Sequence, residues 1–159
     1  SKLPDQQAGH EKGTTITLAA QAGANVVFES AGMLASLLAC SLETLVIDND
    51  LLGAVARTVR GIEVDAQTLS LQVIQDVVEG AGHFLGHEQT LRLMQTEYLY
   101  PSVSDRSSPE DWADAGSSDV RQRAHERVNE ILSLPGPSHI DPAADHLIRE
   151  MFPIHLDRA

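Results

Sequence analysis

The sequence predicts a predominantly α-helical protein with a single buried β-strand. Three observations support this fold class: Ala and Leu dominate the apolar residues, most apolar positions recur at helical spacing, and only one short run is almost continuously apolar. Of the 159 residues, 42% are hydrophobic and 4% are aromatic. A chain of this length and composition can bury the core of one domain.

The first part of the chain is predicted to form one helix and the strand. Residues 5–22 carry a thin apolar stripe behind Asp5, a good N-cap residue, and Gly23 ends the helix. Residues 25–29 form a short apolar run bounded by glycines, which is typical of a strand buried on both faces of a parallel sheet. This strand would place Glu29 at its C-terminal end.

Three helices are predicted in the middle of the chain. Residues 42–60 keep helical spacing, with an acid in the first turn and arginines in the last, although the run 45–47 alone is also compatible with a strand. Asp65 is expected to cap a helix that stops at Gly80. Residues 87–98 supply the third helix.

The last third of the chain is richer in Ser, Asp and Pro, and we expect three further helices there. The order of cap, proline and acids in Ser108–Asp111 predicts a short helix around Trp112. An amphipathic helix is expected over 118–134 and is ended by the run 135–137, and Asp141 opens the last helix.

Composition and charge exclude several classes of function. Asp and Glu number 23 against 11 Lys and Arg, a formal net charge of -12, so we expect no binding to nucleic acid or to an anionic membrane surface. The longest apolar run is far shorter than a membrane span, and a single cysteine, Cys40, fits a reducing, cytoplasmic compartment. Because Cys40 lies in an apolar run without a nearby histidine, a buried, inert thiol is expected rather than a nucleophile.

Two groups of residues resemble metal ligands, and each has a simpler interpretation. His83 and His87 are spaced i, i+4 and could bind a metal from one helical face, but flanking glycines favour a turn in which both rings bond backbone carbonyls. Asp48 and Asp50 suggest a cation loop, yet the glycine and later glutamate of a calcium site are missing, so a solvated helix face is expected. We therefore predict no metal site.

Five polar residues are candidates for ligand binding. Glu29 and Ser30 follow the predicted strand directly, and ligands bind at the C-terminal ends of strands in parallel α/β folds. A carboxylate at such a position can accept a proton or hold a cation, or it can simply pair with an arginine or a helix N-terminus. Asp5, Gln7 and Glu11 surround the start of the first helix, which faces the same side in a βα unit, although Asp5 alone is better explained as an N-cap.

Several blocks of residues carry a family resemblance. They are PDxQAGxEK from Pro4, LAAxAGAN from Leu18, LVIDN from Leu45, RGIEV from Arg60, GHFLxHExT from Gly82, and Asp105–Arg106 with Trp112. In this order and at this spacing they resemble the C-terminal third of the trimethylamine methyltransferase family, over nearly the whole chain to about residue 132.

The resemblance implies the C-terminal fragment of a cytoplasmic (β/α)8 TIM-type barrel enzyme. Such an enzyme moves a methyl group from a tertiary or quaternary amine to the Co(I) corrinoid of a partner protein, so the corrinoid is carried by the partner and not bound directly. Residues 1–61 would be the terminal βα portion of the barrel, and 62–159 a helical C-terminal extension packed on it. Founding members activate the amine with pyrrolysine. This chain has none, and many relatives that lack it act on glycine betaine or related methylated amines. The resemblance therefore implies a member of the non-pyrrolysine type, with an amine of the trimethylamine or glycine betaine class as substrate.

The same resemblance ranks the pocket residues expected in this chain, which are Glu29 and Ser30 first, then Asp5, Gln7 and Glu11. The catalytic residues would lie upstream of Ser1, so we expect the isolated chain to be inactive. We also expect it to self-associate through apolar surface around Val26 and Phe28. The rival interpretation is a non-catalytic, acidic helical module for protein binding or assembly.

Overall fold

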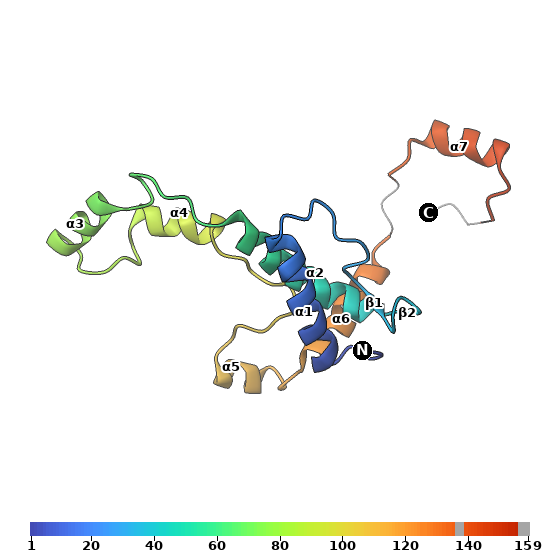
Figure 1. Ribbon diagram of the computed structural model, residues 1–159, viewed down its shortest axis with the longest axis horizontal. Helices are drawn as coiled ribbons and strands as arrows, with labels where there is room; N and C mark the ends of the chain where they lie inside the picture. Colours follow the sequence, from blue (N-terminus) through green and yellow to red (C-terminus); the bar gives the residue numbers. More distant parts are fainter. Residues whose placement is uncertain (136–138, 156–159) are drawn as a thin grey trace.

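The computed structural model describes residues 1–135 and 139–155. These residues form α1 (Gln6–Gln21), β1 (Met33–Leu34), β2 (Ala39–Cys40), α2 (Leu42–Arg60), α3 (Leu71–Glu79), α4 (Glu88–Thr96), α5 (Pro109–Asp114), α6 (Val120–Ser133) and α7 (Pro142–Met151). In the elongated molecule, α2 lies at the centre with α1 and α6 packed against it, while α3 and α4 extend to one side and α7 stands apart (Figure 1). The predominantly helical class is confirmed, and the barrel stays a prediction.

Local capping explains where several helices begin. The Asp5 carboxylate accepts a hydrogen bond of 3.0 Å from a backbone N–H of the first turn of α1, and Ser41 and Ser108 cap α2 and α5 in the same way. At α6, Asp119 accepts from the N–H of Gln122, and the Gln122 side-chain oxygen accepts from the N–H of Asp119. Each such cap stabilises a helix by about 1 kcal/mol, and each is visible in the sequence.

The C-terminal helices begin where the sequence predicts them. Asp141 caps α7 by accepting from two backbone N–H groups of the first turn. α6 ends at Ser133, and Gly136 and Pro137 of its predicted stop lie outside the described residues. α4 also matches the expected helix over 87–98, shortened slightly at its ends.

The predicted strand over 25–29 is wrong. This segment consists of turns and irregular backbone, Glu29 has a φ of 52°, and the side chains of Val26 and Phe28 are 74% and 85% exposed. A strand buried on both faces needs a neighbouring strand on each side. Within the described residues, however, the only strand pair is the short antiparallel pair β1–β2, which follows this segment. The apolar run therefore lacks the partners that would make it a strand.

Two other expectations, for the run 45–47 and for the helix after Asp65, also need comparison with the structure. The run 45–47, left open as a strand, lies inside α2. The helix expected from Asp65 begins later, because Asp65 caps only a single turn by accepting from the N–H groups of Gln67 and Thr68 at 2.8 and 2.7 Å. Ser70 then takes a φ of 54°, which interrupts the helical path before α3. These hydrogen bonds, foremost that of Thr68, lower the pKa of Asp65.

The buried core is small for a chain of this mass. Its apolar members lie mainly on α1, α2 and α6, namely Ala8, Ile16, Val55, Ala124 and Val128, together with Leu34, Val77 and Val103. The accessible surface is 12245 Å², whereas a compact monomer of 17.2 kDa exposes about 7,800 Å². The chain therefore exposes about 4,400 Å² more than a compact monomer would. None of the described helices is both long enough and apolar enough to cross a membrane.

Gly32 is expected to be intolerant of a side chain. It has a φ of 77°, and an added Cβ would lie 3.3 Å from the Cβ of Leu45. Gly32→Ala should therefore lower the free energy of unfolding by about 2 kcal/mol, through backbone strain and this contact together. Gly23→Ala is the matched control, because its φ is 84° but nothing lies within 4 Å, and it should cost about 1 kcal/mol. Urea unfolding followed by circular dichroism measures both, and equal losses would rule out the contact as a cause.

Candidate functional site

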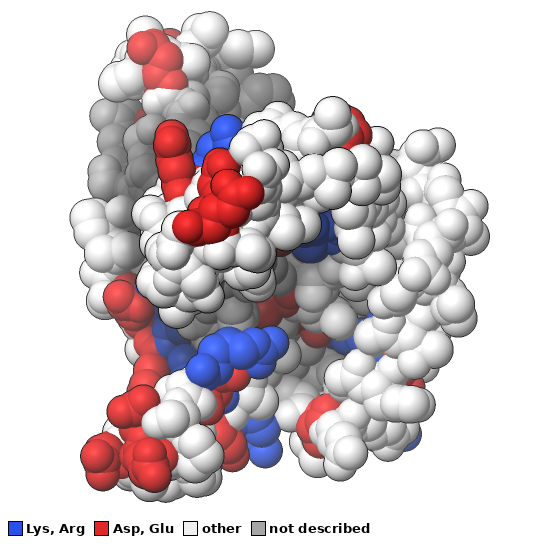
Figure 2. Space-filling view, turned by 90° about the vertical axis from the view of Figure 1, so that its left-hand side faces the viewer, with Lys and Arg blue, Asp and Glu red and all other residues white. Residues whose placement is uncertain are grey.

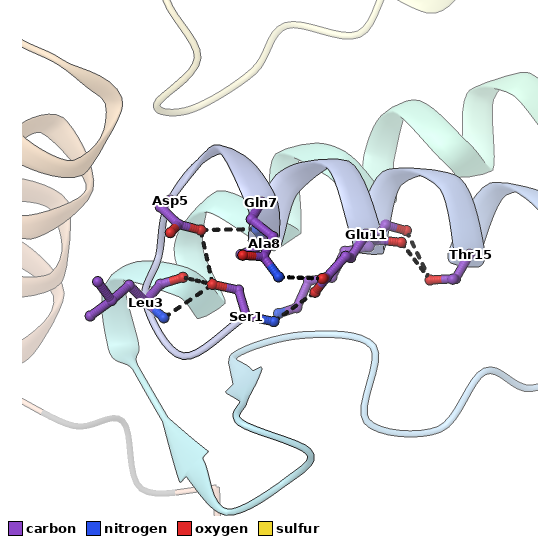
Figure 3. A network of polar contacts seen from close by, with 8 residues as sticks. Ser1, Leu3, Asp5, Gln7, Ala8, Glu11 and Thr15 are labelled. Atoms are coloured by element: carbon purple, nitrogen blue, oxygen red, sulfur yellow. Dashed lines mark hydrogen bonds and ion pairs between the residues drawn. The ribbon is translucent and has the colours of Figure 1, made fainter.

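The candidate residues at the start of α1 share one polar network (Figure 3). One Asp5 carboxylate oxygen accepts from the N–H of Ala8 at 3.0 Å and from the Ser1 hydroxyl at 2.9 Å. Further along α1, the two Glu11 oxygens accept from the Gln7 side-chain amide and from the Ser1 amino group, each at 2.6 Å. The structure thus brings Asp5, Gln7 and Glu11 together on an exposed side of α1.

The electrostatics of this network favour ionised carboxylates. The hydrogen bond from the N–H of Ala8 is the main cause of a lowered pKa at Asp5. The Ser1 amino group, followed by the Gln7 amide, lowers the pKa of Glu11. Carboxylates with lowered pKa values stay ionised at neutral pH, so they attract cations and cannot serve as general acids there.

A hollow of about 310 Å³ lies between α1 and the β1–β2 hairpin. Its lining includes Glu11, Lys12, Glu29 and the segment 33–37. Glu29 and Glu11, which the sequence placed in different ranks of one expected pocket, therefore border the same hollow. Ser30 is half-buried and is not among the residues that line it.

A second hollow, of about 610 Å³, lies where the first turns of α1, α2 and α6 meet. Asp5, Asp119 and Arg121 contribute charged groups to its lining, and Thr44 contributes to its α2 side. Thr44 is only 3% exposed, and its hydroxyl has no hydrogen-bond partner in the described part of the chain. Three of the five predicted residues therefore border these hollows, Asp5 on this one and Glu11 with Glu29 on the other, whereas Gln7 and Ser30 line neither.

Asp48 forms a buried anchor that also contributes to the lining of the larger hollow, and the expectation of a solvated face is wrong for it. It is 3% exposed, it forms an ion pair with the ammonium group of Lys12, and it accepts from the N–H of Gly32 at 2.8 Å. One carboxylate on α2 therefore fixes both α1 and the start of the hairpin. Because Lys12 lines the smaller hollow, the ion pair between Lys12 and Asp48 positions one wall of that hollow.

Asp50 is a second buried anchor, and the expectation of a solvated face is wrong for it as well. It is 7% exposed and accepts four hydrogen bonds of 2.8–2.9 Å, from the N–H groups of Ser102, Val103 and Ser104 and from the Ser102 hydroxyl. Burial raises the pKa of Asp50, but these donors outweigh burial and lower its pKa to about 2. The carboxylate thus holds the segment before α5 against α2.

Two further carboxylates, Glu43 and Asp105, form contacts that hold α6 and the turn before α5 in place. Glu43 lies 3.0 Å from Nδ1 of His125, a contact that joins α2 to α6 and is the main cause of a Glu43 pKa of about 2. Asp105 accepts from the hydroxyl and the N–H of Ser107, which lower its pKa and form the turn that leads to α5.

His83 and His87 do not belong to a cluster of three or more metal-ligating residues within the described part of the chain. Nδ1 of His87 accepts from the N–H of Gln89 at 3.1 Å and caps α4, so the ring bonds a backbone N–H and not the expected carbonyl. No cluster of three or more His, Cys, Asp or Glu suited to a metal ion occurs among the described residues, which include His83. Cys40, expected to be buried, is exposed on β2 because neither residue of this strand is covered.

The chain is similar to proteins named as methyltransferases of methylated amines. It is 44% identical to the trimethylamine methyltransferase of Methanosarcina barkeri over 144 residues, which cover 89% of this chain and 28% of that protein. It is 39% identical to a trimethylamine methyltransferase of Methanosarcina acetivorans over an alignment of 162 residues, covering all of this chain and 31% of the relative. The glycine betaine methyltransferase of Desulfitobacterium hafniense is 34% identical over 145 residues, which cover 91% of this chain and 30% of the relative. All three relatives are named as methyltransferases.

Within this class the family can be stated. The family model described as trimethylamine methyltransferase matches residues 1–153. The chain belongs to the trimethylamine methyltransferase family, which confirms the resemblance found in the sequence blocks. It spans less than a third of the length of the curated relatives described above.

Proposed function

We propose that this chain is part of a cytoplasmic enzyme that transfers a methyl group from a tertiary or quaternary amine to a corrinoid protein. The family match over residues 1–153 carries the proposal. The names of the relatives suggest an amine of the trimethylamine or glycine betaine class. Because the chain spans less than a third of these relatives, the active unit includes further sequence, and the isolated chain is inactive. The non-catalytic module is the weaker alternative, since the relatives are named as enzymes.

The chemistry of the donor indicates what this chain would contribute. In the transfer the carbon–nitrogen bond would break and leave its electron pair on the nitrogen, and the Co(I) corrinoid of the partner protein would supply the electron pair that accepts the methyl group. A quaternary ammonium has no N–H, so a protein can hold it only by negative charge, aromatic faces and shape. Glu29 supplies negative charge at the smaller hollow, where Glu11 is paired with the Ser1 amino group, whereas Phe28 is 85% exposed and is not among the residues that line this hollow. The role proposed for this chain is therefore electrostatic attraction and orientation of the amine.

The test uses the complete polypeptide that contains this chain, mixed with a reduced corrinoid protein and either trimethylamine or glycine betaine. We expect methylcobalamin to form, which its absorbance spectrum detects. If no methylated amine donates a methyl group, the proposed function is refuted. Glu29→Gln should raise KM for the amine about tenfold and change kcat little, because it removes attraction of the substrate cation. Glu63→Gln, at an exposed position away from that hollow, is the control. Equal KM values in the two variants would show that Glu29 does not contribute to amine binding. The conclusion about methyl transfer, which rests on methylcobalamin formation, would be unaffected.

A further inference from the structure

Lys12 brings a positive charge to the wall of the smaller hollow, where the amine cation is proposed to bind. The other charged side chains of this lining are Glu11, which is paired with the Ser1 amino group, and Glu29. The Glu29 carboxylate has no hydrogen bond or ion pair within the described residues. A free lysine ammonium group in a hollow of about 310 Å³ would compete with an amine cation for Glu29. Binding of an amine at Glu29 therefore requires that Lys12 be neutralised elsewhere.

Asp48 neutralises Lys12 from behind the wall of the hollow. One of its carboxylate oxygens accepts from the Lys12 ammonium group and, at 2.8 Å, from the N–H of Gly32. Asp48 itself is not among the residues that line the smaller hollow. The two side chains are 16% and 4% exposed, whereas the other side-chain ion pairs of the described residues are more exposed, like the basic patches that lie beside acidic ones in Figure 2. Water and salt screen a buried pair weakly, so this pair holds the ammonium group in one place.

We propose that Asp48 is a positioning residue for amine binding, which holds the Lys12 ammonium group away from Glu29 and so leaves Glu29 free to attract a singly charged methylated ammonium ion. The inference deepens the proposed function and rests on the part of it that places the amine at Glu29. It adds that the charge presented by the hollow depends on a residue outside its lining. Loss of the Asp48 charge should let Lys12 pair with Glu29, and removing Lys12 as well should restore the attraction.

The complete polypeptide that contains this chain is compared as the parent, as Asp48→Asn and as the double variant Lys12→Met with Asp48→Asn. Titration calorimetry with tetramethylammonium measures the dissociation constant without requiring methyl transfer. Asp48→Asn should raise this constant about tenfold, because the released ammonium group competes for Glu29. The double variant should bind within about threefold of the parent, because both charges of the pair are gone. Lys12→Met alone should bind at least as tightly as the parent.

The matched control is Asp50→Asn, which also replaces a buried acid of α2 but is not among the residues that line the smaller hollow. Its dissociation constant should equal that of the parent. A double variant that binds as weakly as Asp48→Asn would overturn the proposal, since structural damage accumulates whereas a released charge is cancelled. Equal constants for Asp48→Asn and the parent, or a parent that does not bind tetramethylammonium, would overturn it too.

Methylcobalamin formation by the parent is measured separately, with trimethylamine or glycine betaine as the donor. If methyl transfer occurs but the expected order of dissociation constants is not observed, only the role of Asp48 fails. If that order is observed but no transfer occurs, the proposed reaction fails, and Asp48 still controls the binding of the cation.

Discussion

Replacing Asp50 by alanine is expected to lower the free energy of unfolding by about 3 kcal/mol. The carboxylate is 7% exposed and is the acceptor for three backbone N–H groups and one hydroxyl. Its removal leaves these donors without an acceptor, and that of Val103 is in a residue only 3% exposed. Urea unfolding measures the loss. Asp119→Ala, which removes an exposed helix cap, is the comparison and should cost about 1 kcal/mol.

The charge of Asp50 also makes a distinct contribution that depends on pH. Its pKa is about 2 in the folded protein, against an ordinary value of 3.8. Because folding lowers this pKa, the charged form stabilises the fold above about pH 4, and this stabilisation is lost as the pH falls towards 2. The shift corresponds to about 2 kcal/mol.

Asp50→Asn separates this charge from the shape of the side chain. It should be less stable than the parent at pH 7 by about 2 kcal/mol, with the difference shrinking between pH 4 and pH 2. A difference that stays constant over this range would show that the carboxylate contributes by shape alone.

The starts of α1 and α5 could be predicted from the sequence because their causes are local. Asp5 and Ser108 cap helices within three residues of themselves, so the pattern of residue types contains the whole interaction. The strand over 25–29 could not be predicted in this way. An apolar run becomes a buried strand only if other strands lie beside it, and the sequence of the run does not show whether they do.

The buried carboxylates of Asp48 and Asp50 show, for the candidate site too, that sequence reasoning fails where the partners are distant in the chain. Thr44, Asp48 and Val55 recur at helical spacing and are all buried, so Asp48 occupies a stripe that faces other elements. An acid on such a stripe was a signal for a buried partner. The partners, however, are Lys12, Gly32 and residues 102–104, which are distant in sequence, and nothing local identifies them.

Lys12→Met is expected to lower the free energy of unfolding by about 3 kcal/mol, because it leaves the buried carboxylate of Asp48 without its cation. The side chains of Lys12 and Asp48 are 16% and 4% exposed, so water replaces the lost partner poorly. The N–H of Gly32 still donates to Asp48 and limits the loss. Lys2→Met, at an exposed position, should change stability by less than about 0.5 kcal/mol.

A second substitution tests the cause. Asp48→Asn keeps an oxygen for the N–H of Gly32 but carries no charge, so the variant Lys12→Met with Asp48→Asn should recover about 1 kcal/mol or more relative to Lys12→Met alone. If the two losses simply add, the cost comes from lost packing of the lysine stem and not from an unpaired charge. Because Lys12 also lines the hollow of Glu11 and Glu29, the recovered variant shows whether the geometry of that hollow depends on the ion pair or only on the packing around it.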